Sequence, residues 1–149
     1  MGNLYDYFAA ADDQTAAATF DDAPDPKVLK VLDVKGIEPF IQLGTLEALL
    51  RDVDYDAVTE EPRHCCLLTD PDSESKWVVT LTDTLRDALA EASEARLAEV
   101  AIPWSQTEEF QYSASEDLAD LLADFLGRFA ELARHARDQQ LRLYCWMCL

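Results

Sequence analysis

The chain has 149 residues, of which 49% are hydrophobic and 28% charged, with only four glycines and six prolines. This composition is typical of a folded domain and excludes a disordered chain or one with long linkers. Thirty acidic residues against 12 basic ones give a net charge of −18, which repels phosphate and argues against binding to nucleic acid or to an anionic membrane.

The first part of the chain is predicted to be mostly helical. The alanine-rich segment 3–19 indicates a helix, because alanine has the highest intrinsic helix propensity. Two prolines in residues 21–26 break the pattern, since proline removes a backbone donor and restricts the residue before it. The apolar run 27–34 fits a short helix or a strand. A further helix is predicted from Pro39 to Leu50, with the proline in the first turn, where its missing N–H costs least.

The middle of the chain predicts a β-hairpin followed by two helices. Residues 65–69 and 77–82 are β-prone runs on either side of the turn sequence Asp-Pro-Asp-Ser-Glu-Ser, which favours a hairpin. A helix is predicted over 84–92. Ser93 is expected to start another short helix, which ends at the Ile-Pro-Trp sequence of residues 102–104.

The most periodic stretch predicts a long amphipathic helix over about 115–138. Its apolar residues recur at the spacing that places them on one helical face: Leu118, Leu121, Leu122, Phe125, Phe129, Leu132, Ala133 and Ala136. Ser113 and Glu116 form the S-x-x-E pattern of a helix start. Residues 141–148 then predict a terminal strand in the same sheet as the hairpin. We therefore expect one α+β domain over residues 1–149, in which the long helix and several shorter ones pack on a small, mostly antiparallel sheet.

Three parts of the chain share a layout with a known family. They are the Met-Gly-Asn-Leu-Tyr sequence of residues 1–5, the Leu-Asp-Val-Lys sequence of residues 32–35 before an apolar helix, and the order of elements over 77–149. This layout resembles the YfbM-like family of uncharacterised bacterial proteins. The resemblance implies an α+β fold and a cytoplasmic bacterial protein, and it brings no activity or catalytic residues.

The cysteines suggest either a metal site or buried structural thiols. Cys145 and Cys148 form a C-x-x-C pattern, and His64 precedes a pair of cysteines, which are residue types that bind zinc. Successive side chains of a strand point to opposite faces, so Cys145 and Cys148 cannot converge on one ion while the segment is extended. We therefore predict structural thiols, no metal and no cofactor, with Cys145, Cys148 and His64 as the candidate ligands under the alternative.

The most site-like segment is 104–110, a polar stretch with a large aromatic residue at each end. As a recognition loop it combines contact area with directional hydrogen bonds. As a connector, its aromatic side chains would pack under the long helix. The candidate binding residues are Trp104, Ser105, Gln106, Glu108, Glu109 and Phe110.

Charge and motifs together predict a non-enzymatic, acidic interaction protein. The sequence contains no G-x-S-x-G, Walker A, dinucleotide-binding glycine or H-E-x-x-H motif. A surface this acidic attracts a basic partner protein, such as the toxin that an immunity-type inhibitor covers, although solubility alone also explains the charge.

The alternative function is a small hydrolase or metal-binding enzyme that uses Glu108, Glu109 or His64. It is less favoured, because adjacent carboxylates diverge and a hydrolase would need a second acid from elsewhere. The apolar runs fall far short of the roughly 20 residues that span a bilayer, and no basic segment precedes an apolar core at the N-terminus. We therefore expect a cytoplasmic protein, and the sequence predicts no oligomeric state.

Overall fold

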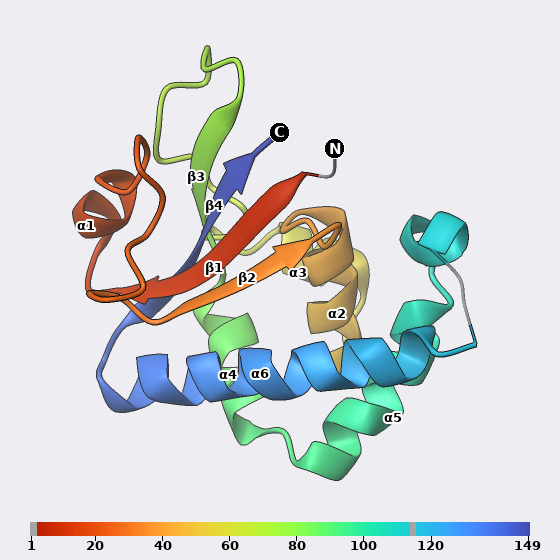
Figure 1. Cartoon of the computed structure of the whole chain (residues 1–149). Helices are drawn as coiled ribbons and strands as arrows, with labels where there is room; N and C mark the ends of the chain where they lie inside the picture. Colours follow the sequence, from red (N-terminus) through yellow and green to blue (C-terminus); the bar gives the residue numbers. More distant parts are fainter. Residues whose placement is uncertain (1–2, 114–115) are drawn as a thin grey trace.

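The computed structural model describes residues 3–113 and 116–149. In chain order its elements are β1 (Leu4–Ala10), α1 (Asp13–Ala17), β2 (Val31–Lys35), α2 (Ile41–Arg51), α3 (Tyr55–Thr59), β3 (Lys76–Thr80), α4 (Asp83–Glu91), α5 (Glu94–Ser105), the 3-10 helix η1 (Glu108–Ser113), α6 (Leu118–Asp138) and β4 (Arg142–Cys148). In the described ranges, four strands form one antiparallel sheet in the order β2-β1-β4-β3, and α6 packs on one face of it (Figure 1). The predicted α+β class is confirmed.

The helix predicted over residues 3–19 is wrong in its first part, which forms strand β1, and only the short helix α1 forms in its second part. Tyr5 and Tyr7 point to the face of the sheet that carries α6, whereas Phe8 and Ala10 belong to a second buried cluster on the other face. The strand is central, with β2 on one edge and β4 on the other. Helix propensity is a weak preference, and burial on both faces with pairing on both edges overrides it.

The predicted hairpin forms only in part. Its second arm is β3, but the first arm touches β3 through a single β-bridge, between Leu67 and Val79, and is not a regular strand. Cys65 has a φ of +47°, a left-handed conformation that interrupts extended backbone. The Thr69 side chain also replaces a backbone partner, because its hydroxyl accepts from the Val78 N–H at 3.2 Å. The predicted terminal strand is confirmed as β4, which lies between β1 and β3.

The capping residues explain where α2 and α5 begin. The Glu38 carboxylate accepts from the backbone N–H groups of Phe40 and Ile41, each at 2.7 Å, so α2 begins two residues after Pro39. The Ser93 hydroxyl caps α5, as expected. The Ile-Pro-Trp sequence forms the last turn of α5, which ends at Ser105, one residue beyond the predicted end. The proline lies in the last turn, where it removes only one helical hydrogen bond.

Helix α6 agrees with the sequence prediction at its end and differs at its start. It begins at Leu118, whereas Ser113 closes η1; residues 114 and 115, where the predicted helix would begin, lie outside the described ranges. Leu121 is 63% exposed and not part of the inner face. It sits roughly 80° from the centre of the apolar stripe at 100° per residue, and Leu126 takes its place in the core.

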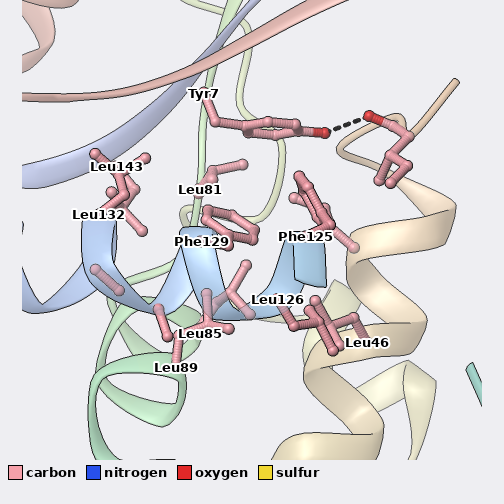
Figure 2. Close-up of a cluster of buried hydrophobic side chains, with 14 of the residues drawn as sticks. Tyr7, Leu46, Leu81, Leu85, Leu89, Phe125, Leu126, Phe129, Leu132 and Leu143 are labelled. Carbon is pink, nitrogen blue, oxygen red and sulfur yellow. Dashed lines mark hydrogen bonds between the residues drawn. The ribbon is translucent and has the colours of Figure 1, made fainter. Parts of the chain in front are cut away.

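The main core lies between the sheet and the helices. Figure 2 shows Phe125 and Phe129 of α6 beneath Tyr7 of β1, with leucines from α2, α4 and β4 around them. The Tyr7 ring is fully buried, and its hydroxyl donates to the backbone oxygen of Ile37 at 2.6 Å (Figure 2). Burial raises the pKa of this phenol well above its usual value. This contact ties the start of α2 to the centre of the sheet.

Candidate functional site

The aromatic residues of segment 104–110 belong to the core. Trp104 is fully buried at the end of α5, and its indole N–H donates to the backbone oxygen of Gln42 in α2 at 2.9 Å. The Phe110 ring meets it edge-on, with 5.2 Å between ring centroids. Phe125 of α6 stacks on Trp104 at 6.3 Å. The packing interpretation therefore accounts for both aromatic residues, and neither presents a surface to a partner.

The polar residues of the same segment lie outside this core. The Ser105 hydroxyl donates to the Ile102 backbone oxygen at 2.7 Å, and Gln106 caps α5. Glu108 and Glu109 are exposed in the first turn of η1. Carboxylates are favoured there by the unpaired N–H groups of the turn. The structure therefore splits the segment into a buried aromatic pair and an exposed polar group, instead of bringing them together.

The thiols of the C-x-x-C pattern lie on opposite faces of the sheet, as their odd spacing in a strand predicted. Cys145 is buried in the core beneath α6, whereas Cys148 packs against the cluster on the other face. Burial raises the pKa of Cys65 to about 12 and that of Cys145 well above its usual value, so both are protonated at neutral pH. Across residues 3–113 and 116–149, no three His, Cys, Asp or Glu side chains are arranged to hold a metal ion.

His64 packs against the first turn of α2. Its ring lies 5.0 Å from the Phe40 ring, and a Cβ added to Gly44 would come within 3.2 Å of its Cε1 atom. Its Nε2 is buried without a hydrogen-bond partner in the described part of the chain, and burial lowers its pKa. The nearby Glu47 carboxylate is already occupied, since it accepts from the Thr82 and Thr84 hydroxyls and from Arg51.

A hollow lies between α5 and α6. These two helices pack against each other (Figure 1). The hollow has a volume of about 520 Å³ and adjoins a second hollow of about 260 Å³. The same four residues line both hollows: Glu94, Leu97, Gly127 and Glu131. We call the two together the α5–α6 groove.

The floor of the α5–α6 groove is apolar and its rim is charged. Leu97 is buried, and Ala98 and Ala123 add small side chains beside it. Gly127 adds none, and an added Cβ at this position would find no atom within 4 Å. The remaining charged residues on the rim are Asp124, Arg128 and Arg134.

The two arginines of the groove are engaged within the fold. The Arg128 Nε lies 3.2 Å from the Asp124 carboxylate. The Arg134 guanidinium donates to the backbone oxygens of Ala90 and Ala92, at 3.2 and 2.9 Å, where α4 ends. Glu94 and Glu131 form no ion pair with other described residues. Three carboxylates and two guanidinium groups thus give the groove a net charge of −1, and Glu94 and Glu131 carry the carboxylates without an ion-pair partner.

Sequence reasoning did not identify the groove, although one signal was present. A glycine in the interior of a 21-residue amphipathic helix costs about 1 kcal/mol relative to alanine, so Gly127 calls for a reason. Glu94 and Glu131 carry no comparable signal, because an exposed glutamate on a helix is ordinary. Only the packing of α5 against α6 brings these residues to one place.

Comparison of the chain with protein-family models, with curated proteins and with solved structures finds no match. The resemblance to YfbM-like proteins therefore stays a prediction. Within the described ranges, none of the helices has the length and apolar composition needed to cross a membrane. Function has to be argued from the α5–α6 groove and from the charge of the chain.

Proposed function

We propose that this chain is a non-enzymatic, acidic interaction protein that binds a segment of a basic partner protein in the α5–α6 groove. The observation that carries the proposal is the groove itself, which joins an apolar floor to an acidic rim. An apolar floor supplies buried area, and a complementary rim steers the partner and fixes its register. A net charge of −18 adds long-range attraction for a cationic surface.

The surroundings of His64, Glu108 and Glu109 favour an interaction protein over the alternative enzyme. His64 has a lowered pKa, and its Nε2 has no hydrogen-bond partner among the described residues, so no neighbouring carboxylate there supports that nitrogen as a general base. Glu108 and Glu109 are exposed neighbours at the start of η1. In its specific form, the proposal is an immunity-type inhibitor in the cytoplasm whose partner is a cationic toxin, because a cationic surface is what the acidic groove complements.

The proposal is tested by capture from native lysate with three baits. The wild-type chain is compared with Glu94→Gln/Glu131→Gln, which neutralises the groove, and with Asp72→Asn/Glu74→Gln. The latter pair removes the same charge from the exposed loop before β3, which projects away from α5 in Figure 1. Retained proteins are quantified by mass spectrometry.

We expect a basic protein to be retained by the wild type and the loop variant and lost by the groove variant. Equal retention by all three baits would mean that net charge alone captures it, and the groove would then have no part in binding. Retention of no basic protein by the wild type at low salt would refute the proposed function.

A further inference from the structure

We infer that the groove at Gly127 binds one long cationic side chain, an arginine or lysine of the partner. The methylene stem of this side chain lies over Gly127, in the space that a Cβ would occupy in any other residue. Its charged head lies at the carboxylates of Glu94 and Glu131. This inference rests on the proposed function and adds to it the chemical group that the groove recognises. Three observations support it: the two hollows share four lining residues, the space at Gly127 is open, and Glu94 and Glu131 form no ion pair with other described residues.

The space at Gly127 is not needed by the fold. A glycine weakens a helix interior, because its backbone loses more freedom on folding than that of alanine. Glycine is usually kept where a neighbouring atom leaves no room for a Cβ, but an added Cβ at Gly127 has nothing within 4 Å. Gly127 therefore makes α6 less stable than an alanine would, and it does so at a position that lines both hollows. A side chain from outside the molecule is the group that would use this space.

The chemistry around Gly127 selects a long cation. The apolar floor is formed by Ala98 and Ala123 over the nearly buried Leu97, and it suits the methylene stem of lysine or arginine. Glu94 and Glu131 line both hollows and have no ion-pair partner in the described part of the chain, so their charge is available to a ligand. An acidic or neutral side chain would leave these carboxylates uncompensated, and a short cation would not cover the apolar floor.

The test uses nuclear magnetic resonance, because the chain has only four glycines and their amide signals are readily resolved. The probes are three heptapeptides that differ only at the central residue, which is arginine, lysine or citrulline. Citrulline keeps the length and hydrogen-bonding shape of arginine without its charge. We expect a saturable shift of the Gly127 amide at low salt with arginine or lysine, and at least about tenfold weaker binding with citrulline.

Two substitutions of Gly127 distinguish an effect on folding from an effect on binding. Gly127→Leu fills the space and Gly127→Ala adds a single methyl group, and both should keep an unfolding midpoint at or above that of the wild type. Binding of the arginine peptide should fall at least about tenfold in Gly127→Leu and less in Gly127→Ala. Full binding by the leucine variant would overturn the inference, as would equal binding of the citrulline peptide or no saturable shift of the Gly127 amide.

The failure of this inference can be told apart from that of the proposed function. If the partner captured from lysate is lost by Glu94→Gln/Glu131→Gln and kept by Gly127→Leu, the groove binds its partner, but not through a cationic side chain over Gly127. If both variants keep the partner, the groove is not the binding surface and both proposals fail. Loss of the partner from both variants, with Asp72→Asn/Glu74→Gln unaffected, supports both.

Discussion

Gly44 and Gly127 are both helical glycines, but packing encloses only the first. A Cβ added to Gly44 would lie 2.8 Å from Cε2 of Tyr55 and 3.2 Å from Cε1 of His64, so those rings have to move. Overpacking of this kind costs about 1 to 3 kcal/mol, against a gain of about 1 kcal/mol in helix propensity. We expect Gly44→Ala to lower the free energy of unfolding by about 1 kcal/mol in a guanidinium titration.

Gly127→Ala is the matched control for this substitution. It makes the same chemical change in a helix without a clash, so the free energy of unfolding should rise by about 0.5 to 1 kcal/mol. If both variants changed stability in the same direction, the contrast in packing between the two sites would be wrong.

His64 gives the molecule a pH dependence of known sign. Burial lowers its folded-state pKa below the ordinary value of 6.5, so the unfolded chain binds the proton more readily. The stability that depends on neutral His64 is therefore complete above pH 6.5 and is lost as the pH falls through the folded-state pKa. We expect the free energy of unfolding to decline from about pH 7 to 5.5, before most carboxylates titrate, and the decline to be smaller in His64→Gln.

His135 serves as the control, because the chain has only two histidines. His135→Gln should keep the wild-type decline over the same pH range. Parallel stability curves for the wild type and His64→Gln would contradict the assignment of this pH dependence to the buried imidazole.

At the scale of elements, the parts predicted well are those whose sequence pattern and surroundings agree. α6 carries a continuous apolar stripe, and β4 is a run of β-prone residues, so both were expected close to their observed bounds. β1 was missed because the alanines within and after it outweighed the β-prone aromatic residues Tyr5, Tyr7 and Phe8. The α5–α6 groove could not be predicted, since it arises only from how two helices pack.

The buried Trp104 side chain holds α5 against α2 and α6. It joins the last turn of α5 to α2 through the Gln42 backbone oxygen and to α6 through Phe125. Truncation of a buried tryptophan costs about 3 to 5 kcal/mol, so Trp104→Ala should be strongly destabilised in thermal or guanidinium unfolding. Trp104→Phe should lose less, because it keeps an aromatic ring and gives up only the indole N–H. An unchanged unfolding midpoint in Trp104→Ala would restore the interpretation of this residue as a partner contact.

At the scale of the whole molecule, the net charge of −18 acts on folding and on binding in opposite ways. Excess like charge destabilises the compact state through self-repulsion and attracts a cationic partner. Salt screens both effects, because the Debye length falls from about 10 Å at 0.1 M to about 3 Å at 1 M. Added sodium chloride should therefore raise the unfolding midpoint of the free chain.

The same increase in salt should weaken binding of the arginine heptapeptide, measured by the shift of the Gly127 amide. The two responses have a common origin but different locations, since repulsion is spread over the surface whereas binding depends on the rim of one groove. Asp72→Asn/Glu74→Gln should thus reduce the salt dependence of stability and leave that of binding nearly unchanged. Glu94→Gln/Glu131→Gln should reduce both, because these carboxylates contribute to the repulsion and also face the bound cation. If both double variants altered the salt dependence of binding equally, the overall field of the protein would be what holds the peptide.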